Sequence, residues 1–341
     1  MSRFRMPAEW ESQSAIWLSW PHNRETWPQN LAEAQSEFAA LVHAIAESQQ
    51  VRVLVPGDQI DVVAAKLSGP ANVEFVSIAT NDAWARDYAP TFVHDLESGD
   101  LVSVDWYYNA WGDKYPPFDL DQQVAKKVAD FLGIRNVAGG LCFEGGAIEV
   151  NQSGTLLTTE SCALNPNRNA GKSKAEVESV LIERLGCRKV VWLPGDDREC
   201  KTLPGDDTDG HIDQLARFVD DDTIVHAWVD QSDARLEALS ANVTALEHEL
   251  PEANLVPLML PQPFEYCGRQ IPASYCNFLI TNESVIVPQF EVPEDKAAID
   301  VLDSLFTNRN IHPLGSRNLA VGLGSFHCLS QQQPAFSAVH C

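Results

Sequence analysis

Segments with helical periodicity alternate with short strand-like runs along the whole chain, and this alternation restricts the fold more than any other feature of the sequence. The clearest helical segment spans residues 31–49, where apolar side chains recur at spacings of three and four. Further helices are predicted at residues 58–67, 121–132, 174–185, 232–250 and 294–306. Strands are predicted between them, at residues 51–55, 73–78, 101–108, 155–159, 189–193, 223–229 and 278–288. This order of elements predicts an α/β fold.

No low-complexity stretch, charge block or Pro/Gly-rich linker divides the chain. We therefore expect a single catalytic domain over residues 1–341, with its reactive side chains drawn from residues 84–328. The elements follow one another as repeated strand–strand–helix–strand units of about 60–70 residues, although a doubly wound sheet shows the same alternation. No G-x-G-x-x-G follows the first strand and no P-loop is present, so a nucleotide site has no support.

The balance of charges excludes several classes of protein. With 24 Lys and Arg against 48 Asp and Glu, the formal net charge is −24, which disfavours binding to nucleic-acid phosphates. The acidic balance suits either plain solubility or a cationic substrate. No apolar run approaches the roughly 20 residues of a membrane helix, and the N-terminal residues do not form a secretory signal.

The cysteines indicate a reducing compartment. None forms a C-x-x-C pair, and the content is far below that of a disulfide scaffold. We expect reduced thiols that mostly pack in the core, in a cytoplasmic protein. The eight positions are Cys142, Cys162, Cys187, Cys200, Cys267, Cys276, Cys328 and Cys341.

Four polar segments concentrate reactive side chains, at residues 81–90, 143–147, 204–213 and 322–333. Their spacing is close to the length of the repeated unit. Asp87 and Glu144 are 57 positions apart and Glu144 and His211 are 67 apart, whereas Asp213 and Cys328 are 115 apart, about two such units. One polar group at the same place in each successive unit would converge at the centre of a ring of units.

The first two segments also have purely structural interpretations. The run from Asn81 to Pro90 fits a turn in which Arg86 pairs with Asp82 or Asp87 and Trp84 is buried. The glycines after Glu144 fit a close approach of the backbone to another group, or a tight turn before a strand.

The last two segments carry the most reactive residue types. His211 and Asp213 would share one face of a strand and suit acid–base catalysis, or a metal site together with Asp209. Cys328 follows a glycine-rich turn in a polar loop, which favours an accessible nucleophile over a core thiol. His327 would point to the opposite face of a strand, so it is not predicted as the partner base.

Taken together, these segments resemble the agmatine deiminases, in the family grouped with the bacterial peptidylarginine deiminases. The resemblance covers residues 6–333 and rests on several motifs in order, which are Met6-Pro-Ala-Glu-Trp10, Trp17-Leu-Ser-Trp-Pro21-His-Asn23, Asn81-Asp-Ala-Trp-Ala-Arg-Asp87, Glu144-Gly-Gly146, Leu164-Asn-Pro-Asn-Arg168-Asn169, Asp209-Gly-His-Ile-Asp213, Pro272-Ala-Ser-Tyr-Cys-Asn277 and His327-Cys328 with Gln331-Gln332. It implies a pentein α/β propeller, five ββαβ units in a pseudo-fivefold arrangement around a central active site.

The resemblance also implies a role for each matching residue. Cys328 matches the nucleophile, His211 the general acid–base residue and Glu144 the carboxylate beside that histidine. Asp87 and Asp213 match the acids that clamp a guanidinium group. The substrate pocket is expected to include Trp84, Asp87, Asp213 and Gly324.

The implied activity is that of a hydrolase acting on a C–N bond of a linear amidine, converting agmatine to N-carbamoylputrescine and ammonia through a thiouronium adduct. No metal or other cofactor is expected, and putrescine biosynthesis, a homodimer and no nucleic-acid or membrane partner are implied. Ala89 and the loop 322–326 depart from the family pattern, which bears on pocket shape.

Three other functions remain open from the sequence. The first is deimination of arginine, peptidylarginine or a methylated arginine. Free arginine would need a cation for its carboxylate, and the sequence does not place Arg168 or Arg269. The second is a metal-dependent hydrolase built on His211, Asp209 and Asp213. The third is a non-catalytic protein that binds cations.

Overall fold

The computed structural model describes residues 2–67, 69–196 and 201–336, whose strands form six sheets. Two sheets have four strands, in the orders β19 (Ser330–Pro334), β2 (Gln13–Ser19), β3 (Gln50–Val55), β4 (Val73–Ser77) and β1 (Phe4–Arg5), β5 (Thr91–Asp95), β6 (Leu101–Tyr107), β7 (Arg135–Cys142). Three sheets have three strands, in the orders β10 (Lys189–Leu193), β9 (Thr155–Thr159), β8 (Glu149–Val150); β11 (Ala216–Phe218), β12 (Thr223–Trp228), β13 (Asn254–Met259); and β16 (Leu279–Ile280), β17 (Ser284–Gln289), β18 (Asn310–Gly315). The last is the hairpin of β14 (Phe264–Tyr266) and β15 (Arg269–Ile271).

The five larger sheets share one connection pattern. An antiparallel pair leads through a helix into a parallel strand, as in β5–β6 followed by β7. The crossover helices are α1 (Leu31–Ala46), α5 (Val124–Leu132), α8 (Lys174–Leu185), α9 (Leu236–Glu249) and α10 (Glu294–Leu305). The shorter helices are α2 (Ile60–Lys66), α3 (Ala85–Tyr88), α4 (Ala110–Asp113), α6 (Glu160–Ala163), α7 (Pro166–Asn169), α11 (Arg317–Ala320) and α12 (Phe326–Leu329), with 3₁₀ turns at Gly57–Gln59, Asp121–Gln123, Gly145–Ala147, Ile212–Gln214 and Tyr275–Asn277.

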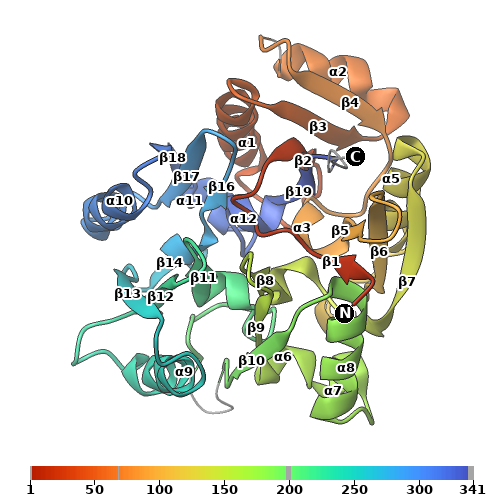
Figure 1. Ribbon diagram of the computed structural model, residues 1–341. Helices are drawn as coiled ribbons and strands as arrows, with labels where there is room; N and C mark the ends of the chain where they lie inside the picture. The colour runs from red at the N-terminus through yellow and green to blue at the C-terminus, as the bar shows by residue number, and fades with distance from the viewer. Residues whose placement is uncertain (1, 68, 197–200, 337–341) are drawn as a thin grey trace.

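Long helices lie toward the outside of the molecule, and short helices lie both at its edge, as α2 and α7 do, and near its middle (Figure 1). In Figure 1, α5, α8, α9 and α10 lie at the periphery, whereas α3 and α12 lie near the middle. Each long helix buries an apolar stripe on its own sheet. In α1 this stripe includes Phe38, Leu41, Val42 and Ile45, which are fully buried. The predicted alternation of helices and strands is confirmed. The short segments that include α3 and α12 lie near the middle of the molecule.

The predicted boundaries agree best where local signals are strong. Helix α8 begins with a capping box between Ser173 and Glu176 and ends at Gly186, which has a left-handed φ of 72°. The strand predicted over residues 278–288 is wrong, because a turn closed by Thr281 and Ser284 divides it into β16 and β17. The helix predicted from residue 232 begins at Leu236, since Asp233 accepts hydrogen bonds from Arg235 in a preceding turn.

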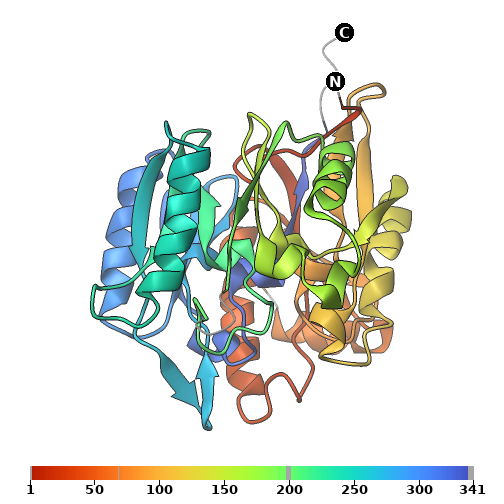
Figure 2. The ribbon, with the colours of Figure 1, turned by 90° about the horizontal axis from the view of Figure 1, so that it is seen from below.

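Both ends of the chain are built into sheets. Strand β19 pairs antiparallel with β2, and β1 pairs antiparallel with β5. The residues just before β19, which form α12, are thereby fixed against the first sheet. On another face the hairpin β14–β15 projects from the molecule (Figure 2). Among the described residues, no helix has the length and apolar character needed to cross a membrane.

Candidate active site

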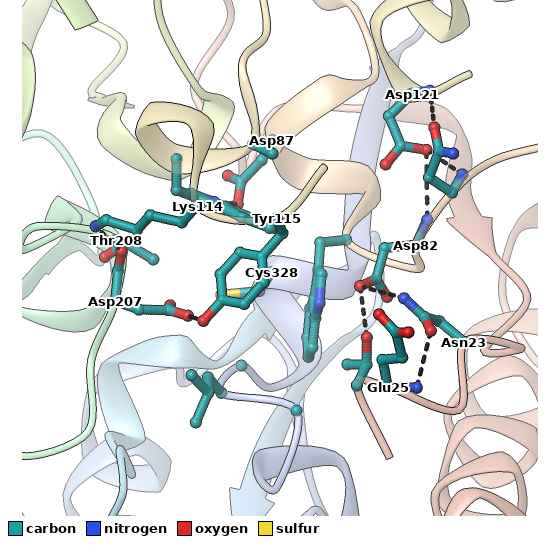
Figure 3. A pocket seen from close by; sticks show the side chains of 18 of the residues that line it. Asn23, Glu25, Asp82, Asp87, Lys114, Tyr115, Asp121, Asp207, Thr208 and Cys328 are labelled. Carbon is teal, nitrogen blue, oxygen red and sulfur yellow. Dashed lines mark hydrogen bonds between the residues drawn. The ribbon is translucent and has the colours of Figure 1, made fainter. Parts of the chain in front are cut away.

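The predicted residues converge on one cavity of about 710 Å³. Cys328, Asp87, Trp84 and Gly324 line it directly, together with residues from loops that follow several different strands. Glu144, His211 and Asp213 are fully buried in contact with this group. Figure 3 shows Asp87, Lys114, Tyr115, Asp207 and Thr208 around Cys328, with Asn23, Glu25, Asp82 and Asp121 on the other side.

Cys328 lies in the short helix α12 and not in the polar loop that the sequence suggested. Its side chain is buried, and the residue has only 4% of its surface exposed, at the cavity wall. The Nδ2 group of Asn277 donates to Sγ at 3.1 Å, and Gln214 Nε2 lies 3.8 Å away. Burial raises the pKa of the thiol well above its usual value, and the carboxylates of Asp213 and Asp87 add to this effect. These surroundings therefore favour the neutral thiol.

Asp213 lies in a 3₁₀ turn, so the expectation that it shares a strand face with His211 is wrong. Its Oδ2 atom accepts hydrogen bonds from His327 Nδ1 at 2.7 Å and Asn277 Nδ2 at 3.2 Å, and lies 3.6 Å from Cys328 Sγ. Its Oδ1 atom is buried and has no hydrogen-bond partner among the described residues. Although burial opposes ionisation, the contact with His327 lowers the pKa of Asp213 below its usual value. An ionised carboxylate oxygen is thus left free to accept a donor.

His211 sits between two acids at the start of that turn. Nδ1 is 3.7 Å from Asp87 Oδ1 and Nε2 is 3.6 Å from Glu144 Oε2. Neither nitrogen has a hydrogen-bond partner in the described part of the chain, although the side chain is fully buried. Burial alone would lower the pKa of His211, but Asp87, Cys162 and Glu144 outweigh it and raise the pKa well above its usual value. The imidazole is therefore protonated at neutral pH.

Glu144 is kept ionised by a buried arginine. Arg168 Nε donates to Glu144 Oε1 at 2.6 Å, and both side chains are almost fully buried. Burial raises the pKa of Glu144, but the Arg168 charge and the His211 contact bring it below its usual value. Arg168 also donates to Asp209 Oδ2 at 2.8 Å, which ties the Glu144 carboxylate to the loop before His211.

Asp87 is held by backbone and side-chain donors at the end of α3. Gly146 N donates to Oδ1 and Trp111 Nε1 donates to Oδ2, each at 2.9 Å. A Cβ atom on Gly146 would lie 2.4 Å from His211 Nδ1, so the predicted close approach of the backbone after Glu144 is confirmed. Burial raises the pKa of Asp87 to about 6, despite the opposing effect of His211.

The position of Trp111 depends on an unusual backbone. Ala110, Trp111, Gly112 and Asp113 all have positive φ values, at 48°, 58°, 91° and 61°. Left-handed conformations cost non-glycine residues roughly 1–2 kcal/mol each. The surrounding structure compensates, since the Asn109 side chain accepts a hydrogen bond from Gly112 N at 2.9 Å. This strained turn delivers the Trp111 indole to Asp87.

The purely structural interpretation of residues 81–90, with Trp84 buried and Arg86 paired with Asp82 or Asp87, is only partly correct. Trp84 is buried, but Arg86 pairs with neither Asp82 nor Asp87. Arg86 instead donates to the His327 carbonyl oxygen at 3.2 Å and to Gln332 Oε1 at 2.5 Å. The six-membered part of the Trp84 ring packs on Gly324, where a Cβ atom would lie 2.4 Å from a ring carbon. Gly324 therefore leaves room for the aromatic wall of the cavity.

The cavity contains more acids than bases. Its acidic residues are Glu25, Asp82, Asp87, Asp121 and Asp207, and its basic residues besides His22 are Arg24, Lys114 and Arg269. Lys114 Nζ is 2.9 Å from Asp209 Oδ2, and Arg269 Nη2 is 3.8 Å from Asp207 Oδ2. Two of the three strong bases are therefore already paired with carboxylates.

The described residues offer two groups that have metal-ligand atoms within 4.8 Å of one another. One comprises Glu144, Cys162 and His211, and the other comprises Glu9, Glu149 and His327. The set predicted for a metal site, His211 with Asp209 and Asp213, is not assembled. The Asp209 carboxylate instead accepts from Arg168 and Lys114, and Asp213 accepts from His327. In each metal-ligand group a buried arginine pairs with a carboxylate, which disfavours a cation.

Six cysteines are free thiols in the structure, as the sequence predicted. They are Cys142, Cys162, Cys187, Cys267, Cys276 and Cys328, and all except Cys267 are buried. Cys200 and Cys341 lie outside the described residues.

Comparison with known protein families identifies the family to which this chain belongs. The model of the Porphyromonas-type peptidyl-arginine deiminases matches residues 5–334. The chain belongs to this family. It is 36% identical to an agmatine deiminase of Ectopseudomonas mendocina, with 97% of this chain and 96% of that protein covered. It is 37% identical to an agmatine deiminase of Pseudomonas savastanoi pv. phaseolicola over the same fractions.

Solved structures agree with this family membership. A substrate-bound agmatine deiminase of C. jejuni, which carries a cysteine-to-serine substitution, superposes with a TM-score of 0.89 at 30% identity, covering 98% of this chain and 97% of that one. A DDAH from Pseudomonas aeruginosa has a TM-score of 0.51 at 12% identity over 94% of this chain and 99% of that one, which supports the shared fold alone. The resemblance seen in the motifs is confirmed for this deiminase family.

Several residues that contact the predicted catalytic side chains were not assigned a role in the sequence analysis. Glu9, Arg168, Asn277 and His327 all lie in the motifs shared with the deiminase family, so the motifs pointed to them without showing their partners. Trp111 had no such signal. Its contact with Asp87 depends on the left-handed turn at residues 110–113.

Proposed function

We propose that this chain hydrolyses agmatine to N-carbamoylputrescine and ammonia, with Cys328 as the nucleophile. One observation carries this proposal. A buried thiol lies at the wall of an acidic cavity, 3.6 Å from Asp213 Oδ2, while the other oxygen of Asp213 has no partner among the described residues and Asp87 lines the same cavity. Two carboxylates placed in this way suit the N–H groups of a planar guanidinium, which they hold by charge-assisted hydrogen bonds. The names of the aligned relatives support agmatine as the substrate.

Substrate binding would activate the nucleophile. The Cys328 thiol is disfavoured as an anion by burial and by the charges of Asp213 and Asp87. A guanidinium bound between these acids neutralises their field, so the thiol releases its proton to solvent when the cation is present. Asn277 Nδ2, 3.1 Å from the sulfur, then stabilises the thiolate.

His211 and Glu144 would carry the protons. The thiolate forms a C–S bond to the guanidinium carbon, and His211 protonates the amino group that leaves as ammonia. The resulting thiouronium adduct is attacked by water, whose proton passes to the now neutral His211. The C–S bond then breaks and the sulfur leaves with the electron pair, which yields the ureido product. The buried Glu144 carboxylate, held by Arg168, stabilises the protonated form of His211.

The distribution of charge favours agmatine over arginine. Lys114 and Arg269 are paired with Asp209 and Asp207, so Arg24 alone of the three strong bases in the cavity has no carboxylate partner among the described residues. The excess of acids suits the second cationic group of agmatine.

We also propose that the five strand–strand–helix–strand units form a pentein propeller with pseudo-fivefold symmetry, as one domain over residues 1–341. A cytoplasmic homodimer that contributes to putrescine biosynthesis completes this proposal.

The test is ammonia release from agmatine, arginine and a blocked arginine peptide, measured with EDTA present. We expect turnover of agmatine by the wild type and by Cys187→Ala, which removes a buried thiol outside the cavity. Cys328→Ala should bind agmatine without turnover. Activity retained in Cys328→Ala would refute the nucleophile, loss of activity in EDTA would favour a metal enzyme, and turnover of arginine or the peptide alone would change the substrate.

A further inference from the structure

Behind the thiol, a row of buried charged groups runs away from the cavity. His327 Nδ1 lies 2.7 Å from Asp213 Oδ2, and His327 Nε2 lies 2.9 Å from Glu9 Oε2. Arg217 Nη2 donates to the same Glu9 oxygen at 2.6 Å, and Arg217 Nε donates to Glu149 Oε2 at 2.8 Å. All five side chains are buried. The proposed reaction assigns no task to Glu9, His327, Arg217 or Glu149.

The contacts of His327 determine its protonation. Both ring nitrogens face carboxylate oxygens, and an ionised carboxylate can only accept hydrogen bonds. The pKa values of Glu9 and Asp213 are both lowered: burial opposes this, but Arg217 and His327 outweigh it at Glu9, and His327 outweighs it at Asp213. A neutral imidazole has a single N–H and would leave one nitrogen lone pair directed at a carboxylate oxygen. Only the doubly protonated ring satisfies both acids.

We propose that His327 is a positioning residue, a bridge that donates through both ring nitrogens to Glu9 and Asp213, holds Asp213 Oδ2 and supplies the positive charge that the Cys328 thiolate needs. Asp213 Oδ2 is the oxygen that lies 3.6 Å from Cys328 Sγ, so the bridge acts on the sulfur through one shared atom. With Oδ2 engaged in this way, Oδ1 has no partner among the described residues and can accept from a guanidinium donor. This inference deepens the proposed function and rests on it.

Among the charged groups around His327, Glu9 is the one that links its ring to a neighbouring cation. The groups that face it are the carboxylates of Glu9, Glu149 and Asp213, and the guanidinium groups of Arg86 and Arg217. Arg86 Nε donates to the His327 backbone carbonyl, not to the ring. Arg217 Nη2 donates to the same Glu9 oxygen as the His327 ring, so Glu9 carries the link between the two cations.

Two conservative variants separate this role from structural support. Glu9→Gln replaces the charged acceptor of His327 with a neutral amide, while Glu149→Gln removes the other carboxylate partner of Arg217 and leaves both His327 contacts in place. The readout is the rate at which iodoacetamide alkylates Cys328 without substrate, followed at pH 6–9 by mass spectrometry of its peptide. This readout does not depend on the identity of the substrate.

In Glu9→Gln, His327 Nε2 loses its charged acceptor, and the alkylation profile should move up by about one pH unit. At pH 8, alkylation and kcat for agmatine should both fall about tenfold, with a smaller change in KM. Glu149→Gln should keep the wild-type alkylation profile, even where its melting temperature falls. A wild-type profile in Glu9→Gln, or equal shifts in both variants, would overturn the proposal.

A second variant decides the question if Glu9→Gln does not fold. His327→Gln keeps a neutral N–H donor for Asp213 but has no charge. It should alkylate about tenfold more slowly than the wild type at pH 8. Wild-type alkylation in His327→Gln would show that the charge is not needed. If His327→Gln slows alkylation but the wild type does not turn over agmatine, the bridge is retained and agmatine is rejected as the substrate.

Discussion

Removing Arg168 should isolate the Glu144 carboxylate inside the protein. Arg168→Met keeps most of the side-chain volume but removes the guanidinium that donates to Glu144 at 2.6 Å. Asp209 retains Lys114, whose Nζ is 2.9 Å away, and a donor from Asn167 at 3.1 Å. The substitution therefore removes the arginine partner of one buried acid, and not two, and leaves Glu144 with the longer 3.6 Å contact to His211 alone among its cationic neighbours.

The magnitude follows from the burial of both partners. Breaking a buried ion pair by removing one side costs about 3–5 kcal/mol, because an uncompensated charge remains. Both side chains are almost fully buried, at 0% and 1% exposed, so solvent screening gives little relief. With typical stabilities of about 5–15 kcal/mol, the variant should still fold. Its kcat should fall by about 100-fold or more, in the range of a lost general acid–base contribution.

The pH dependence gives a sharper test. In the wild type, Arg168 and His211 lower the pKa of Glu144, so its stabilising contribution is present above an unfolded pKa of about 4.3. Without Arg168, burial dominates and the folded pKa of Glu144 rises above that value. Its contribution is then lost as pH increases through the raised pKa. The difference in unfolding free energy between wild type and variant should therefore grow from pH 6 to pH 8.

Urea unfolding at both pH values measures this difference. The control is Lys126→Met, which also removes one positive charge from an ion pair but at a site where both side chains are 65% exposed. It should cost at most about 1 kcal/mol, with little change with pH. A loss of less than about 1 kcal/mol in Arg168→Met, or a loss independent of pH, would refute the assignment of Arg168 as the group that keeps Glu144 ionised.

Two further predictions concern the cavity wall and the guanidinium site. Gly324→Ala places a Cβ atom 2.4 Å from the Trp84 ring, so it should reduce the free energy of unfolding by about 1–3 kcal/mol and raise KM for agmatine. In the control Gly315→Ala the nearest atom to the new Cβ is 3.8 Å away, so thermal unfolding and steady-state assays should match the wild type. Equal behaviour of the two variants would contradict the packing argument. Because the pKa of Asp87 is raised to about 6, agmatine binding to Cys328→Ala, measured by calorimetry, should weaken as pH falls below that value. The same measurement in Cys328→Ala with Asp87→Asn should lose this dependence, and an unchanged pH profile would show that Asp87 does not bind the cation.

The long helices and the reactive residues were predictable because their signals are local. Helix α8 has its cap and stop residues next to it in the sequence, and its predicted range agrees with the structure. The reactive residues stand at intervals close to the length of one unit, so equivalent positions bring them together. The strands β2, β5, β7, β13 and β18 were not predicted, and two of them, β13 and β18, contain a proline, Pro257 or Pro313, that weakens the strand pattern. These two lie at sheet edges, where proline is tolerated.

The partners of the buried charges could not be predicted, because tertiary contacts decide them. Arg86 is adjacent to Asp87 in the sequence but donates to Gln332, and Arg168 pairs with Glu144, which is 24 positions away. His327 illustrates the same limit. The prediction that it is not the partner base assumed a strand, and the structure has a short helix there, with the ring between Asp213 and Glu9. Glu9 is 318 positions away in the sequence.

The pairing of β19 with β2 has a consequence for how the protein is made. Gln331 in β19 stands opposite Trp17 in β2, so this sheet joins two segments that leave the ribosome 331 − 17 = 314 positions apart. Domains form during synthesis as their contacts become available, and contacts between distant residues form slowly. The segment that carries Cys328 is anchored only when this last strand docks. A nascent chain therefore keeps its thiol apart from Asp87, Glu144 and His211 until β19 has been synthesised.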